Sequence, residues 1–106
     1  MINFEDFEKV DLRIGKIVSA EKVAESEKLV KLEVDFGQEK RQVVAGIGKA
    51  YNSEELINKT AVFVVNLEPR VMMGLESQAM ILAVKDENNL SILVPEKEIT
   101  LGTRIS

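Results

Sequence analysis

Hydrophobic residues along this chain form short runs of strand length, separated by polar or glycine-containing links. The clearest is LVKLEVDFG, residues 29–37, in which Val30, Leu32, Val34 and Phe36 alternate with charged residues. This period of two predicts a strand that buries one face. The run TAVFVVNL, residues 60–67, is apolar throughout, which predicts a more central strand. Further apolar runs of strand length lie at 12–23, 41–48, 79–86 and 90–95.

Two of the remaining segments predict short helices. FEDFEKV, residues 4–10, can begin as a helical turn capped by Asn3. YNSEELINK, residues 51–59, can form a helix capped by Ser53, with acidic side chains in its first turn. The second helix falls between the third and fourth predicted strands.

This order of elements predicts an all-β fold: a five-stranded OB-fold barrel with one short helix, followed by a C-terminal β extension. Glycines at 15, 37, 46 and 48 stand where the strands of a small barrel must bend. The extension is expected to hold a hairpin, DENN followed by LSILVP, and a terminal strand, ITLGTRIS. We expect one domain over residues 1–106, with a core at about 10–86 and the extension at about 87–106.

The link between the runs at 60–67 and 79–86 is longer than a hairpin requires. Its sequence from residue 66 onward is NLEPRVMMGLESQ, whereas a tight hairpin needs only two turn residues. Such a link predicts either an irregular corner of the barrel or a surface that presents side chains to a partner. Met72 and Met73 are interpreted as filling the end of the barrel.

Composition excludes several classes of chemistry. The chain has no histidine and no cysteine, which removes the commonest general base, thiolate ligands and disulfides. Two glycine-rich motifs bind nucleotide phosphates between a strand and a helix, G-x-x-x-x-G-K-S/T and G-x-G-x-x-G, and neither occurs in this chain in that position. We therefore expect no metal, no cofactor and no catalytic site. The absence of a long apolar window and the acidic N-terminus predict a cytoplasmic protein that does not insert into a membrane.

Charge is unevenly distributed. The formal net charge is −4, yet residues 9–49 hold nine Lys or Arg against seven Asp or Glu. A binding face for a polyanion needs local rather than total positive charge, so RNA binding is compatible with this pattern. Aromatic residues make up only 5% of the chain, which argues against a general single-strand binder and less against a binder of folded RNA.

Several stretches together resemble the tRNA-binding domain that occurs at the C-terminus of methionyl-tRNA synthetases, as their beta subunit, or as a free-standing protein. The resemblance rests on FEKVDLRIGKIVSAEKV, SEKLVKLEVDFG, RQVVAGIGKAYNSEELINK, VVNLEPRVMMGLESQAMILA and VPEKEITLGTRI, in that order. It implies an OB-fold module, commonly a homodimer, that binds tRNA by shape rather than by sequence. The implied partners are tRNA and methionyl-tRNA synthetase.

The resemblance also implies a binding site. Lys28 matches a lysine that faces tRNA in this family, Ser77 and Met80 match its serine and methionine near the groove, and Asn66 and Arg70 frame the same surface. The first three strands add basic residues on the face that OB-folds commonly use. The predicted tRNA-binding residues are Lys16, Lys28, Lys40, Arg41, Asn66, Arg70, Ser77 and Met80.

Chemistry alone leaves alternatives open for most of these residues. Asn66 and Ser77 can instead satisfy backbone groups, and a lysine on a half-exposed strand is often only solvated. Arg13 is interpreted as the ion-pair partner of Asp11 or Asp35. Tyr51 can stack on a base or pack in the core.

Two questions of assembly and function also stay open at this point. The C-terminal tail holds five apolar residues that suggest a dimer interface, or else a cover over the open end of the barrel. They are Ile92, Val94, Ile99, Leu101 and Ile105. The rival function is a dimeric protein-interaction or chaperone-like module on the same fold, which the acidic total and the methionines would suit.

Overall fold

The first strand, β1 (Leu12–Lys22), is long enough to belong to two sides of a barrel. Its first half pairs antiparallel with β4 (Thr60–Val64) and its second half with β2 (Val30–Asp35). A register shift between Ile17 and Ser19 marks a bulge, which bends the strand between the two halves. Gly15 lies just before the bend, where an added Cβ would come within 2.6 Å of a Val34 methyl group.

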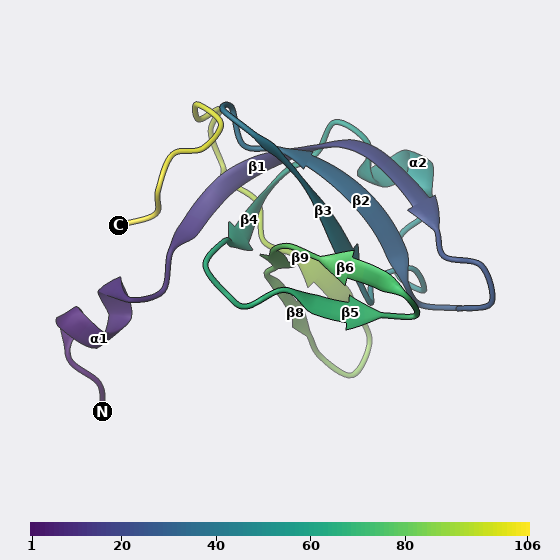
Figure 1. Cartoon of the computed structure of the whole chain (residues 1–106), viewed down its shortest axis with the longest axis horizontal. Coiled ribbons are helices and arrows are strands. Elements are labelled where there is room, and N and C mark those ends of the chain that lie inside the picture. The colour runs from purple at the N-terminus through teal and green to yellow at the C-terminus, as the bar shows by residue number, and fades with distance from the viewer.

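The remaining strands curl the sheet into a nearly closed barrel. In the computed structural model, which describes residues 1–106, β2 pairs with β3 (Lys40–Ala45) and β4 with β7 (Met80–Ile81). The resulting order is β3-β2-β1-β4-β7, all antiparallel. Figure 1 labels the first four of these strands. The predicted all-β OB-fold barrel is therefore confirmed.

Both predicted helices are present. The five-residue helix α1 (Phe4–Glu8) is capped by Asn3, whose side-chain oxygen accepts from the Asp6 N–H at 2.9 Å. The helix α2 (Ser53–Leu56) lies between β3 and β4, as predicted. The expected cap at Ser53 is wrong, because the N-cap residue is Asn52 and no side chain accepts a hydrogen bond there.

The core forms where the alternating faces of the strands meet inside the barrel. In β2, Val30, Leu32 and Val34 are buried, as the period of two predicted. Phe36 and Phe63 meet edge to face with ring centroids 5.4 Å apart, and Leu56 brings α2 onto the same cluster. These apolar contacts fix the curvature of β2, β3 and β4, and so the surface that the barrel presents.

The long link after β4 contains a small hairpin of its own, which was not predicted from the sequence. The strands β5 (Arg70–Met72) and β6 (Leu75–Ser77) pair across a two-residue turn at Met73 and Gly74. Both turn residues have positive φ, 49° and 79°, as in type I′ hairpin turns. Met73 is 56% exposed at the tip, so its predicted place inside the barrel end is wrong.

The predicted strand at 79–86 is divided at Leu82. The Leu82 N–H donates to the Val62 carbonyl of β4, while the Leu82 carbonyl accepts from the Leu93 N–H. The chain therefore passes at Leu82 from pairing with β4 to pairing with the segment that follows β9. It then forms the predicted extra hairpin from β8 (Ala83–Lys85) and β9 (Leu90–Ile92).

The C-terminal segment runs along β1 without forming the expected terminal strand. Backbone hydrogen bonds join Thr103 and Gly102 to Ile14, yet regular pairing is limited to one bridge between Arg13 and Arg104. Gly102 has φ 87° and lies so close to the Phe36 carbonyl that a side chain would not fit, and this turn interrupts the strand. No helix of the protein is long and apolar enough to cross a membrane.

Candidate nucleic-acid interface

Half of the cations on this protein, seven of the fourteen Lys and Arg residues, are paired with a nearby carboxylate. The ion pairs have N–O distances of 2.7 to 3.7 Å. They involve Lys9, Arg13, Lys31, Lys40, Arg41, Lys49 and Arg104. Lys22 donates instead to the Gly48 carbonyl at 2.9 Å. The cations that have no such partner are Lys16, Lys28, Lys59, Arg70, Lys85 and Lys97.

Lys28 lies beside the C-terminal end of β3, next to Gly46 and Gly48. The Lys28 carbonyl accepts from the Gly48 N–H at 2.7 Å, and a side chain at Gly48 would meet that same carbonyl. The Lys28 stem passes close to Gly46, and the residue is exposed. The link between β1 and β2 is thus fixed on the segment that follows β3, and the Lys28 ammonium group is left free.

Arg70 is tied to the other edge of β3 through its partner in the hairpin. Arg70 lies directly opposite Ser77, and the Ser77 hydroxyl accepts from the Val44 N–H of β3 at 3.0 Å. The Arg70 side chain is exposed and makes no ion pair or hydrogen bond. Two unpaired cations, Lys28 and Arg70, therefore flank the C-terminal end of one strand.

Met80 adds an apolar group to this neighbourhood. It lies in β7 opposite Val64 and is 47% exposed. The residue before it, Ala79, is buried and accepts a hydrogen bond from the Ser77 hydroxyl at 2.8 Å. A flexible thioether at this position offers a soft surface for an unstacked base.

Ser77 and Asn66 both satisfy backbone groups. Ser77 is 6% exposed, and its hydroxyl is used as acceptor and as donor. The Asn66 amide accepts from the Asp11 N–H at 2.9 Å and donates to the Lys9 carbonyl at 2.6 Å. Asn66 thereby fastens the chain before β1 to the end of β4.

The other predicted residues lie apart from the end of β3. Lys16 is in the middle of β1, opposite Asp35 and Thr60. Thr60 lines a depression with Pro95 and Lys97 of the C-terminal segment. Lys40 begins β3, at the opposite end of that strand from Lys28, and its ammonium group lies 3.7 Å from Glu33. The structure thus places Lys28, Arg70 and Ser77 around the C-terminal half of β3, with Met80 three residues after Ser77, and separates Lys16 and Lys40 from them.

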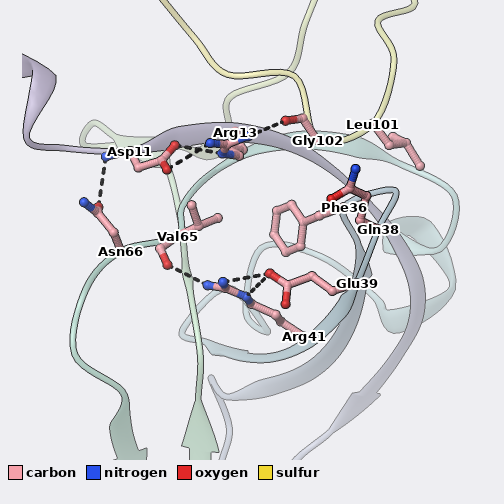
Figure 2. Close-up of a pocket in the computed structure, with 10 residues that line it drawn as sticks. All are labelled: Asp11, Arg13, Phe36, Gln38, Glu39, Arg41, Val65, Asn66, Leu101 and Gly102. Carbon is pink, nitrogen blue, oxygen red and sulfur yellow. Dashed lines mark hydrogen bonds and ion pairs between the residues drawn. The ribbon is translucent and has the colours of Figure 1, made fainter.

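A hollow of about 650 Å³ opens near the start of β3, with Phe36 at its wall (Figure 2). Its lining includes two ion pairs, Arg13 with Asp11 and Arg41 with Glu39. Arg13 is held by the Asp11 carboxylate and the Gly102 carbonyl, and the hydrogen bond and charge of Asp11 raise the Arg13 pKa above its ordinary value. This confirms the predicted pairing with Asp11 and excludes Asp35 as the partner. Arg41 is held by Glu39 and by the Val65 carbonyl.

The residues that join β3 to β6 were not predicted from the sequence. The Gln42 N–H donates to the Gln78 side-chain oxygen, and the Gln78 N–H donates to the Gln42 carbonyl, and nothing in the local sequence around these two glutamines indicates it. Tyr51 is partly buried against the core, and its hydroxyl accepts from the Ile92 N–H at 3.1 Å. That contact favours a packing role over stacking on a base.

Comparison with known proteins identifies the family. The profile of the family described as "Putative tRNA binding domain" matches residues 12–104. This chain belongs to the tRNA-binding domain family. It is 50% identical over 105 residues to a methionine–tRNA ligase of Caldanaerobacter subterraneus subsp. tengcongensis, covering 99% of this chain and 16% of that protein. The chain thus spans about a sixth of the length of such relatives.

Solved structures agree with the assignment of this tRNA-binding domain. A methionyl-tRNA synthetase-related protein from Pyrococcus horikoshii has a TM-score of 0.94 and 36% identity, covering 100% of this chain and 98% of that one. The chaperone CsaA from Bacillus anthracis str. Ames has a TM-score of 0.89 and 40% identity, covering 100% and 99%. The family is therefore shared by proteins whose names give different roles.

Replacement of Ser77 by alanine tests whether its hydroxyl is structural. The change leaves the Val44 N–H and the Ala79 carbonyl without their partner, so we expect a loss of about 1–3 kcal/mol in the free energy of unfolding, measured by urea denaturation. Ser91→Ala is the matched control, because Ser91 is exposed and donates only to a neighbouring carbonyl. Equal stability of the two variants would contradict the structural role.

Proposed function

We propose that this domain binds tRNA without sequence specificity and serves as an accessory domain or subunit of methionyl-tRNA synthetase. The observation that carries the proposal is the position of Lys28 and Arg70, two exposed cations without carboxylate partners on opposite edges of the end of β3. Membership of the tRNA-binding domain family supports it.

The mechanism rests on release of counterions from the tRNA backbone. Cations that are free in the unbound protein gain a phosphate without losing an internal partner, whereas paired cations must first break an ion pair. We assign phosphate contacts to Lys28 and Arg70, and contact with an unstacked base to Met80. Lys16 and Lys40 contribute attraction at longer range, and Asn66 and Ser77 hold the surface in shape.

An accessory domain of this kind adds affinity through its attachment. A weak contact tethered to an enzyme that already holds tRNA acts at a high effective concentration, so it strengthens binding without changing the chemistry. A cytoplasmic location follows from this role, since tRNA and synthetase meet there. The domain itself contributes no catalytic group to the reaction.

A protein-interaction or chaperone-like role is the second candidate. It is favoured by exposed apolar residues near the same surface, such as Val71, Met73 and Met80, and by the 40% identity to a protein named as a chaperone. Methionine-rich surfaces adapt to varied apolar partners. Binding through such a surface would depend little on salt, which separates it from tRNA binding.

The tRNA proposal is tested by titrating labelled tRNA at about 50 and about 200 mM salt. We expect binding that weakens steeply with salt. In the double variant Lys28→Ala with Arg70→Ala, the slope of log affinity against log salt falls by about 0.9 for each phosphate that the variant no longer neutralises. The matched control is Lys85→Ala with Lys97→Ala, which removes two other unpaired exposed cations and leaves the slope unchanged.

Two outcomes would overturn this proposal. Absence of tRNA binding at the lower salt concentration would refute it. Affinity for a protein client that is insensitive to salt would then favour the chaperone-like role. A slope that falls equally in both double variants would move the site away from the end of β3.

We further propose that the domain forms a homodimer through α1 and the chain termini. No residue of α1 is buried, and Phe4 is 67% exposed. The helix projects from the barrel near the C-terminus (Figure 1). Phe4, Phe7, Val10 and Ile105 line a depression there. A five-residue helix with an apolar face is not stable alone in water, so packing against a second copy would account for it.

Light scattering at several protein concentrations tests the dimer. We expect the wild type to have the mass of two chains, and Phe4→Ser with Phe7→Ser to shift it toward one chain by removing apolar area from the interface. Val71→Ser with Met73→Ser, two equally apolar changes on the β5–β6 hairpin, should leave the mass unchanged. A monomeric wild type, or a dimer that survives the α1 variant, would contradict the proposal.

A further inference from the structure

The β5–β6 hairpin is attached to the barrel mainly by side chains. Along the junction of β3 and β6, one backbone hydrogen bond runs from the Gln78 N–H to the Gln42 carbonyl at 2.8 Å. The neighbouring bonds come from side chains: the Ser77 hydroxyl, the Gln78 amide oxygen that accepts from the Gln42 N–H, and the Gln42 amide that donates to the Glu76 carbonyl. The position of the hairpin therefore depends on particular residues rather than on a continuous ladder.

Arg41 closes this junction at its far end. One guanidinium nitrogen donates to two carbonyls, that of Val65 at 2.6 Å and that of Gln78 at 3.2 Å. Val65 directly follows β4, and Gln78 directly follows β6, so the two carbonyls mark the two roots of the loop that carries the hairpin. A single side chain thus holds both ends of the loop against β3.

The rest of the Arg41 guanidinium is also occupied. Its Nε and second terminal nitrogen both bond to the Glu39 carboxylate, at 2.9 and 2.7 Å. A guanidinium has five N–H donors, and these contacts leave at most one of them for a phosphate. The side chain is 26% exposed. Arg41 is therefore poorly placed to contact RNA, although its charge and strand had suggested that role.

We propose that Arg41 is a positioning residue for tRNA binding, which holds the β5–β6 hairpin so that Arg70 lies on the same face as Lys28. This inference rests on the proposed tRNA function. In this role Arg41 acts through geometry, whereas a phosphate contact would act through its charge. The two roles predict different results when Arg41 and Arg70 are changed together.

A double-mutant cycle with Arg41→Gln and Arg70→Gln measures the difference. We expect each single variant to weaken tRNA binding by about tenfold, the order seen for residues coupled in one network, and the double variant to be no weaker than Arg70→Gln alone. Arg41→Gln should also lower the salt slope as Arg70→Gln does, because Arg70 no longer meets its phosphate in either variant.

Two conservative changes separate charge from geometry. Arg41→Lys keeps the positive charge but cannot hold Glu39 and both carbonyls with a flat, forked group, so we expect it to weaken binding nearly as much as Arg41→Gln. Lys40→Gln removes a charge from the neighbouring exposed position, away from the hairpin roots, and should weaken binding by less than about twofold.

Loss of stability is controlled separately. Gln78→Met removes the hydrogen bond between the Gln42 N–H and the Gln78 side chain without changing charge. We expect it to weaken tRNA binding, and it replaces Arg41→Gln in the test if that variant does not fold. Tyr51→Phe removes a hydrogen bond to Ile92 away from the hairpin and should leave binding unchanged.

The inference is overturned if the effects of Arg41→Gln and Arg70→Gln multiply, if Arg41→Lys binds like the wild type, or if Arg41→Gln has no effect. A wild type that does not bind tRNA would instead overturn the proposed function.

Discussion

Closure of the barrel at the free edge of β3 is the constraint on which the rest of the molecule depends. A sheet ordered β3-β2-β1-β4-β7 leaves the backbone groups on the outer edge of β3, the edge away from β2, without a strand partner, and buried backbone groups must be satisfied. Here Ser77 and Gln78 satisfy them with side-chain oxygens, which accept from the N–H groups of Val44 and Gln42. The polar residues at this edge are thus required for the fold before any ligand binds.

The distribution of ion pairs explains how an acidic domain keeps cations available at this edge. Most cations of the sheet are paired with a carboxylate on the next strand or in an adjacent link, such as Lys31 with Glu21 of β1 and Arg41 with Glu39 in the link before β3. Such exposed pairs contribute little stability, but they neutralise half of the cations of the protein. Because Lys28 and Arg70 are left unpaired beside the end of β3, that part of the surface keeps free positive charges although the total is −4.

The sequence was sufficient for the elements whose pattern is set by burial. The alternation from Val30 to Phe36 predicted β2 and its inner face, because a half-buried strand has a strict period of two. The β5–β6 hairpin was not predicted, since its turn places Met73 at positive φ, where asparagine or glycine is usual. The division of the strand at Leu82 was not predicted either, because it depends on tertiary contacts: Leu82 bonds to Val62 on β4 and to Leu93 after β9.

The candidate site shows a similar limit. Asn66 and Ser77 are the residue types that either bind RNA or satisfy backbone groups, and only the distances to Asp11 and Val44 show that they do the latter. Arg41 carried the charge expected of a phosphate contact, yet its donors point to Glu39, Val65 and Gln78. Resemblance to a family identifies such positions, but it does not separate a residue that touches the ligand from one that holds the surface.

The central claim is that tRNA binds at the end of β3, between Lys28 and the β5–β6 hairpin. Its most direct test is the nuclear magnetic resonance spectrum of the ¹⁵N-labelled domain as unlabelled tRNA is added. We expect the amide signals of Lys28, of residues 46–48, of residues 70–73 and of Met80 to shift or broaden first. Changes that begin instead in α1, or in residues 95–99 beside Thr60, would contradict the account.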